Sequence, residues 1–138
     1  MKNNLKNKTY VISAAADGIG FAIAKKIISA GGKVYISDIN KKKVNQINKK
    51  YKNKIYATAM DCTNSAEIKN YFHKIKSLKK IDGLINNIGI AGPTKSLENI
   101  KIEEWEETIK TNLHSHFYYT KYSIPFLKKA NKSSIINL

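Results

Sequence analysis

The 138-residue chain contains no arginine, so all 25 of its basic residues are lysine. Together with ten acidic residues they give a formal net charge of +15, which by itself suggests a nucleic-acid partner. Proteins that read nucleic acids usually exploit the bidentate fork of arginine, however, and the lysines here are spread over the whole chain. A/T-rich codons, which favour lysine, asparagine and isoleucine, explain this composition without a ligand. We therefore expect no nucleic-acid partner. A lysine-based nucleic-acid binder is the alternative, and it requires a steep salt dependence of DNA affinity.

Cysteine and long apolar runs are also scarce. The only cysteine, Cys62, excludes an internal disulfide and favours a reducing, cytoplasmic location. No apolar run approaches the ~18 residues that a membrane-spanning helix needs, and the basic N-terminus lacks the apolar stretch of a signal peptide. We therefore expect no membrane partner. A hydrophobic content of 42% is enough for a core, and the length suits one domain, residues 1-138.

Short apolar runs alternate along the chain with segments of helical period. Strands are expected at residues 9–14, 33–38, 54–61, 81–87 and 133–138. Helices are expected at residues 20–32, 41–52 and 64–78, and over a long region with residues stepping by three or four, namely Trp105, Ile109, Leu113, Phe117, Thr120 and Ile124. Pro125 is expected to kink or nearly end that last helix. This alternation predicts an α/β fold, in which right-handed crossovers wind a parallel sheet and helices cover both of its faces.

The stretch Ser13-Ala14-Ala15-Ala16-Asp17-Gly18-Ile19-Gly20 joins the first strand to the first helix. Free N–H groups and the positive dipole end at a helix N-terminus suit a pyrophosphate. Gly18 would let the backbone approach the phosphates, and Gly20 would let the helix pack closely on the strand. Asp38 ends the second strand, where it could accept hydrogen bonds from a ribose hydroxyl and repel a 2′-phosphate. The combination predicts a dinucleotide site that prefers NAD to NADP; the alternative is an ordinary turn, with Asp38 as a helix cap.

Four motifs in order, covering nearly all of the chain, make it resemble a classical short-chain dehydrogenase/reductase. The loop over residues 13–20 matches that family's Thr-Gly-x-x-x-Gly-x-Gly pattern, with alanine in place of the first glycine. That change matters only if position 14 needs a positive φ. Asp61-Cys62-Thr63 is similar to the family's pair beside the adenine, Asn86-Asn87-Ile88-Gly89 to its Asn-Asn-Ala-Gly turn, and the segment 109–120 to its long interface helix.

The resemblance implies a role for each motif. Asp61 accepts a hydrogen bond from the adenine amino group, Cys62 contributes its backbone N–H, Asn86 lies by the cofactor ribose and Gly89 allows a tight backbone path. Asn112 is the one catalytic residue implied, since the family's asparagine perturbs the helix and helps hold a proton-relay water. The complete cofactor set is then Ser13, Asp17, Gly18, Ile19, Gly20, Asp38, Asp61, Cys62, Asn86 and Gly89.

Each of these assignments has a purely structural alternative. Asp61 could be a strand-end turn residue, and Cys62 a small buried apolar residue. The segment 86–89 could be a polar turn, and Asn112 a mid-helix amide bonded to nearby backbone. The glutamates of residues 101–110 are interpreted as the solvated first turns of a helix. His114 and His116, two apart on a helix, point to different faces, so no metal site is expected.

The resemblance also implies a Rossmann-type, doubly wound sheet of order 3-2-1-4-5, and hydride transfer between NAD and a small alcohol or ketone. The family's proton donor is the tyrosine of a Tyr-x-x-x-Lys motif, yet none of the eight tyrosines here has lysine four residues later. We therefore expect a truncated domain, the cofactor-binding part of an oxidoreductase, with its C-terminal strands and helices missing and little turnover of its own. A non-catalytic dinucleotide-binding or interaction module, or a gene remnant, is the alternative. In the full-length form we expect a homo-oligomer through the helix around Asn112.

Overall fold

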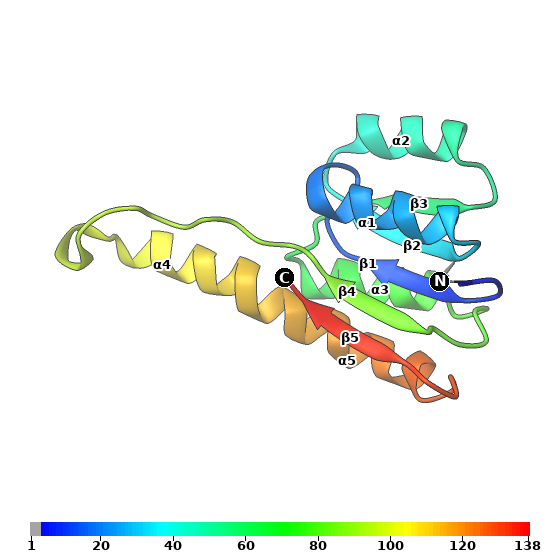
Figure 1. The fold of residues 1–138 in the computed structure, drawn as a ribbon. Coiled ribbons are helices and arrows are strands. Elements are labelled where there is room, and N and C mark those ends of the chain that lie inside the picture. The colour runs from blue at the N-terminus through cyan, green and yellow to red at the C-terminus, as the bar shows by residue number, and fades with distance from the viewer. Residues whose placement is uncertain (1–3) are drawn as a thin grey trace.

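A five-stranded parallel sheet organises residues 4–138, the part of the chain that the computed structural model describes (Figure 1). Its order, β3-β2-β1-β4-β5, is the predicted one. Each strand lies within its predicted range; the strands are β1 (Thr9–Ile12), β2 (Lys33–Asp38), β3 (Ile55–Ala59), β4 (Gly83–Asn86) and β5 (Ser134–Asn137). The order changes direction between β1 and β4, because the chain builds outward from β1 to β3 and then returns to place β4 on the other side.

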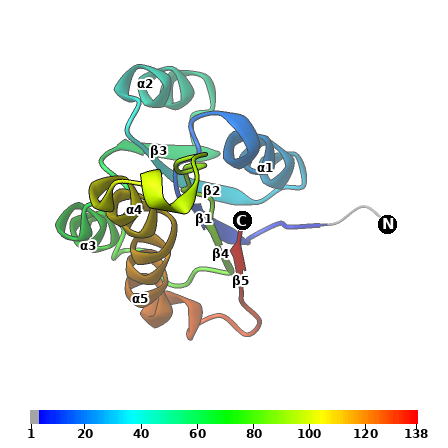
Figure 2. The same ribbon diagram turned by 90° about the vertical axis from the view of Figure 1, so that its left-hand side faces the viewer.

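Helices cover both faces of the sheet, as predicted (Figure 2). One core contains alternate strand residues, such as Ile12 and Ile85, packed with α1 (Gly18–Ser29) and α2 (Lys41–Lys50). The other core contains their neighbours in the strands, such as Val11 and Leu84. It packs against α3 (Ser65–Lys74) and α5 (Ser115–Leu127). Buried residues on both strand faces explain why β1 and β4 read as continuous apolar runs.

The long predicted helix consists of three parts. α4 (Ile102–Ile109) leads into a π-helical segment, η2 (Lys110–His114), which continues as α5. A short 3₁₀ turn, η1 (Leu97–Asn99), precedes them. Figure 1 shows α4 extending beyond the sheet, and none of its residues is buried. The last turn of α5 contains Pro125, and the helix ends at Leu127, so proline marks its end as predicted.

Three apolar residues of the predicted series lie on the outer side of this long helix. Trp105, Leu113 and Phe117 are each more than half exposed, at 54%, 59% and 58%. The face turned to the sheet instead contains buried small or polar residues together with leucine, namely Thr111, Ser115, Tyr119, Ser123 and Leu127. Within residues 4–138, no helix is both long enough and apolar enough to cross a membrane.

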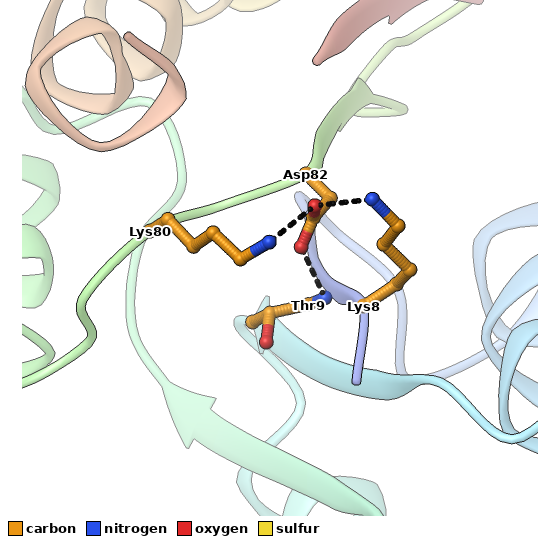
Figure 3. Close-up of polar contacts among 4 residues, drawn as sticks. All are labelled: Lys8, Thr9, Lys80 and Asp82. Carbon is orange, nitrogen blue, oxygen red and sulfur yellow. Dashed lines mark hydrogen bonds and ion pairs between the residues drawn. The ribbon is translucent and has the colours of Figure 1, made fainter. Parts of the chain in front are cut away.

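Asp82 anchors the amino-terminal edge of the sheet, just before β4 (Figure 3). Its nearly buried carboxylate accepts hydrogen bonds from the backbone N–H of Thr9 at 3.0 Å and from the ammonium groups of Lys8 at 2.9 Å and Lys80 at 3.2 Å. Burial alone would raise the pKa of this carboxyl, but the three donors outweigh it and hold the pKa below its ordinary value. The contacts tie the start of β1 to the start of β4.

Candidate functional site

A cleft of about 800 Å³ opens at the carboxyl-terminal edge of the sheet, which is the edge opposite the one where Asp82 precedes β4. Residues that follow β1, β2, β3 and β4 line it, together with residues from α4 and η2. Seven of the predicted site residues are in this lining: Asp17, Gly18, Ile19, Asp38, Asp61, Cys62 and Gly89. In open α/β sheets, ligands bind outside the carboxyl ends of the strands at the point where the strand order reverses, which here lies between β1 and β4.

The loop after β1 contains two residues in the left-handed region. Gly18 has a φ of 56°, which glycine adopts freely, and a Cβ added there would meet nothing within 4 Å. Ala14 has a φ of 48°, so the position where the family pattern has glycine does require a positive φ. The left-handed conformation costs an L-residue about 1–2 kcal/mol. The alanine is accommodated in the loop, but at an energetic cost that the sequence alone does not reveal.

Gly20 permits the closest packing in the loop. A Cβ added at Gly20 would lie 2.5 Å from Nδ2 of Asn87 and 2.9 Å from Cβ of Ala15. The sequence predicted that Gly20 allows the helix to pack closely on the strand. In the structure, the nearest neighbours of an added Cβ lie instead in the loops after β1 and β4. Glycine therefore lets the first turn of α1 sit against both loops at the strand-order switch.

The N-terminus of α1 differs from those of α2 and α3. The side chain of Asn40 caps α2 by accepting from Lys43 N, and Asn64 caps α3 by accepting from the amides of Ala66 and Glu67. The residue at the corresponding position of α1, Asp17, makes no side-chain capping bond. The first N–H groups of a helix have no intrahelical partner, so those of α1 remain available to an anion in the cleft.

Asp38 is held rigidly at the end of β2. Its Oδ2 accepts a hydrogen bond of 2.9 Å from Ala16 N, and its Oδ1 accepts one of 2.9 Å from Asn40 N. Asp17, one residue beyond Ala16, forms an ion pair with Lys43, and this hydrogen bond lowers the pKa of the Asp17 carboxyl. Two carboxylates with different partners therefore lie at the β1 and β2 side of the cleft.

Residues 61–63 form a turn after β3 whose residues also line the cleft. Oδ1 of Asp61 accepts from both the backbone N–H and the hydroxyl of Thr63, at 2.8 Å each. The thiol of Cys62 is nearly buried and accepts a hydrogen bond of 3.2 Å from the hydroxyl of Tyr119, which also bonds to Ser37 Oγ. Burial raises the pKa of this thiol. Asp61 therefore lies in a strand-end turn and Cys62 is nearly buried, as the structural alternatives describe, and both residues still contribute atoms to the lining of the cleft.

Ser13 joins the loops after β1 and β4 rather than lining the cleft. Its buried Oγ accepts from the backbone N–H groups of Asn87 at 3.0 Å and Ile88 at 3.2 Å. In return, Nδ2 of Asn87 donates to the carbonyls of Ser13 at 3.1 Å and Ala14 at 2.7 Å. This reciprocal contact fixes the two loops on either side of the switch point.

Asn86 is fully buried and likewise lies behind the lining. Its Nδ2 donates to Oδ1 of Asn137 at 2.8 Å and to Oγ1 of Thr120 at 3.2 Å, which connects β4 to β5 and α5. Its Oδ1 has no hydrogen-bond partner among residues 4–138. The amide therefore supports the strand end while retaining one unused acceptor.

Asn112 lies in η2, where the helix is perturbed as the resemblance implies. Its amide pairs with the backbone of Ile90 in both directions, accepting from N at 2.8 Å and donating to O at 2.9 Å. It therefore holds the loop after β4 rather than nearby helical backbone. His116 adds a second anchor, with its Nε2 2.8 Å from the carbonyl oxygen of Ile88. A Cβ added at Gly89 would lie 3.5 Å from Oδ1 of Asn112, which is an ordinary van der Waals contact, so this approach alone does not require glycine at position 89.

Sequence reasoning missed several participants. Asn87 and Tyr119 organise the loops through contacts that span 74 and 57 residues, and nothing local in the sequence identifies such partners. Glu107 and Thr111 line the cleft from the long helix. The sequence pattern indicates a solvated helix turn for Glu107 and gives no sign of the cleft. Thr111 is different, because its position next to Asn112 could have identified it as a residue of the site.

The sheet order 3-2-1-4-5, with a ligand-sized cleft at its switch point, defines a doubly wound, Rossmann-type domain. Within that class, the chain belongs to the short chain dehydrogenase family, whose family model matches residues 8–138. This is a family of oxidoreductases that bind nicotinamide dinucleotides.

Individual relatives agree with this assignment. The 7alpha-hydroxysteroid dehydrogenase of Bacteroides fragilis is 28% identical over 99% of this chain and 55% of its own length. A sorbose reductase of Schizosaccharomyces pombe is 32% identical over 96% of this chain and 54% of its own length. The ligand-free aldohexose dehydrogenase of Thermoplasma acidophilum matches with a TM-score of 0.81 and 29% identity, over 96% of this chain and 49% of that one. The chain therefore spans about half the length of the curated relatives it matches.

Proposed function

We propose that the cleft binds NAD and that the chain carries the cofactor-binding half of a short-chain oxidoreductase. The observation that carries this proposal is the convergence of Gly18, Asp38, Asp61 and Gly89, from four different strand ends, on one cleft at the switch point. The uncapped N-terminus of α1 adds donors for an anion there. The reaction would move a hydride between the nicotinamide ring, when NAD is bound, and a small alcohol or ketone.

Different residues of the cleft would bind different parts of the dinucleotide. The first turn of α1, from Gly18 to Gly20, would hold the pyrophosphate, with Asp17 at the N-cap position. Asp38 would accept from the ribose hydroxyls of the adenosine half, and Asp61 with the backbone N–H of Cys62 would bind the adenine.

The buried residues behind these contacts support them. Ser13 and Asn86 hold the strand ends, and Asn112 holds the loop that contains Gly89. For a completed site we assign Asn112 the role of anchoring a proton-relay water beside the reacting atoms.

Turnover needs a proton donor that the 138 residues do not contain in the family's form. None of the eight tyrosines has lysine four residues later, so the usual way to bring a tyrosine from its ordinary pKa of ~10 toward neutrality is missing. Loss of a general acid typically costs ~10²–10⁴ in rate. We therefore propose that residues 1–138 bind NAD without measurable turnover, as a dinucleotide-binding module.

Calorimetric titration of the purified chain with NAD and with NADP tests the proposal. We expect NAD to bind with an exothermic signal, and NADP to bind more weakly. Asp61→Asn should weaken NAD binding, whereas the control Glu104→Gln, which removes a charge on α4 paired with Lys95, should not. A folded chain that binds no NAD at millimolar concentration would refute the proposal.

Two further properties belong to the longer protein that the relatives imply. We propose that it is cytoplasmic and that it assembles as a homo-oligomer through the long helix around Asn112. The exposed apolar side chains of Trp105, Leu113 and Phe117 support the second point. Sedimentation of a form extended to the length of its relatives would test it, with Trp105→Glu expected to shift the species toward monomer.

A further inference from the structure

The sheet has two edge strands, β3 and β5, because its order is β3-β2-β1-β4-β5. An edge strand presents unpaired backbone N–H and C=O groups, which can pair with a strand of another molecule. The four residues of β5 are all exposed, and no side chain among residues 4–138 hydrogen-bonds to their backbone. The outer side of β3 is different, because groups from elsewhere in the chain occupy it.

The direction of the backbone groups of β3 follows from its pairing with β2. The bonds between these two segments include one of 3.0 Å from Val34 N to the carbonyl oxygen of Lys54, and one of 2.9 Å from Met60 N to that of Asp38. In a parallel ladder, every second residue of a strand bonds to a given neighbour. The even-numbered residues of β3 therefore bond to β2, and the odd-numbered residues direct their backbone groups to the outer edge.

Asn48 of α2 covers the middle of this edge. Its Nδ2 donates a hydrogen bond of 2.8 Å to the carbonyl oxygen of Ala57, and its Oδ1 accepts one of 2.9 Å from Ala57 N. A residue of an antiparallel neighbouring strand would make the same two bonds. The Asn48 side chain therefore takes the place of a further strand at the central residue of β3.

The two ends of the edge are covered as well. Ile55 N donates to the carbonyl oxygen of Tyr51 at 3.1 Å, and Asp61 N donates to Oε2 of Glu67 at 2.8 Å. Among residues 4–138, no group accepts a hydrogen bond from the outward N–H of Ala59. The strand itself, IYATA, has neither a charged residue nor a proline, which are the residues that usually protect an edge. Protection of this edge thus depends on groups from outside the strand.

We infer that the outer edge of β3 is a self-association surface that the Asn48 side chain keeps closed, and that the partner of the opened edge is β3 of a second copy of the chain. Antiparallel pairing about Ala57 would place this residue opposite itself, so that the N–H of each copy meets the carbonyl group of the other. No charge within the strand opposes this pairing. The net charge of +15 on the whole chain does oppose it, so the association should strengthen as salt screens that charge.

Amide hydrogen exchange of the original chain, followed residue by residue by NMR, tests whether the edge is closed. After correction for intrinsic exchange rates, the Ala57 amide should exchange about tenfold more slowly than the Ala59 amide, on the scale of one exposed hydrogen bond. Equal corrected rates at the two amides would overturn the inference, and this measurement does not depend on the folding of any variant.

Asn48→Ala opens the edge, and Asn45→Ala is its matched control. Asn45 is an exposed asparagine of the same helix that makes no side-chain hydrogen bond within residues 4–138, and both substitutions bring the same gain in helix propensity. In dilute solution, the Ala57 amide of Asn48→Ala should exchange about tenfold faster than that of the original chain. At higher concentration, sedimentation should detect a weak dimer with a Kd on the order of 0.1–1 mM, because two short edges form a small interface, and the protection of Ala57 should return.

Asn48→Asp separates opening of the edge from loss of stability. The aspartate can still accept a hydrogen bond from Ala57 N, whereas it has no donor for the Ala57 carbonyl group and places a charge at the edge. This variant also loses a hydrogen bond, yet it should remain monomeric with the Ala57 amide protected. Urea denaturation of both position-48 variants establishes that they are folded under the conditions of the test.

Three further results would overturn the inference. If Asn48→Ala stays monomeric at millimolar concentration, the edge of β3 is not a self-association surface. If Asn45→Ala or the original chain associates to the same extent, the contact lies elsewhere, with β5 as the alternative edge. If Asn48→Asp associates as strongly as Asn48→Ala, lowered stability rather than an opened edge causes the association.

Discussion

Replacing Gly20 by alanine should destabilise the chain by inserting a methyl group at the closest contact of the switch point. The new Cβ would lie 2.5 Å from Nδ2 of Asn87 and 2.9 Å from Cβ of Ala15. The Asn87 amide has to move, and with it the two hydrogen bonds that it donates to the carbonyls of Ser13 and Ala14. Ala15 is buried and cannot retreat without moving the backbone of the loop.

Three contributions set the size of the effect. Overpacking a well-packed site costs about 1–3 kcal/mol. Losing two hydrogen bonds costs about 0.5–1.5 kcal/mol each. Part of this loss is already included in the overpacking cost, so the two energies do not add in full. Alanine is a better helix former than glycine by about 0.8–1.0 kcal/mol, which offsets some of the loss because position 20 lies in α1. We expect a net destabilisation of about 1–3 kcal/mol, which lowers Tm by several degrees in a chain of this size.

Urea denaturation followed by circular dichroism measures the change, and Asn87→Ala provides a decisive second variant. Removing the Asn87 amide removes the 2.5 Å collision, so the Gly20→Ala substitution should cost about 1 kcal/mol less in that background. Gly18→Ala is the matched control in the same loop, because its Cβ would meet nothing within 4 Å and only backbone strain opposes it. A Gly20→Ala chain as stable as the original, or equal costs in both backgrounds, would refute the steric argument.

Three other predictions concern named contacts. Asp82→Asn should lower stability at pH 7 by about 1–2 kcal/mol, because it weakens charge-assisted hydrogen bonds to Lys8, Lys80 and Thr9. Since folding lowers the pKa of Asp82, the contribution of its carboxylate to stability is present above the unfolded-state pKa of about 3.9 and is lost as the pH falls through the folded-state pKa. Equal melting curves for Asp82→Asn and the original chain at pH 7 would contradict the prediction. Tyr119→Phe should cost about 1–3 kcal/mol by leaving Ser37 and Cys62 without their partner, whereas Tyr118→Phe, on a half-buried side chain, should be nearly neutral in the same thermal melts. Asp38→Asn should reduce the ratio of NAD to NADP affinity about tenfold in calorimetric titrations, and an unchanged ratio would argue against its ribose role.

Local sequence patterns predicted the elements of this fold well. The strand at 33–38 has the predicted bounds, and the turn at residues 13–20 leads from a strand into a helix as expected. These features depend on the spacing of apolar residues and on the positions of glycines, both of which can be recognised within a few adjacent residues. The sheet order came from the resemblance to a family, and it proved correct because that order belongs to the fold rather than to any one motif.

Contacts between distant segments were not predictable in the same way. The helix around Asn112 shows why: its apolar period runs through Trp105, Leu113 and Phe117, which face outward, and it does not identify the residues of the face turned to the sheet. The inward face uses Thr111 and Tyr119. A helix that packs closely against a sheet needs small or hydrogen-bonded residues there, and the partners that make such residues suitable, Ser37 and Cys62, lie far away in the sequence.

The left-handed alanine at position 14 is explained by the contacts around it. Its φ of 48° costs about 1–2 kcal/mol, and such strain persists only where the surroundings determine the backbone fully. The carbonyl of Ala14 accepts from Asn87, the N–H of Ala15 donates to the carbonyl of Ser37, and the N–H of Ala16 donates to Asp38.

Three consecutive residues are thus held by β4 on one side and β2 on the other. The same bonds hold the Asp38 carboxylate in the cleft, so relaxing the loop would also release the residue that we propose selects NAD. The strain at position 14 is therefore the energetic cost of keeping the loop after β1 in register with both of its neighbours.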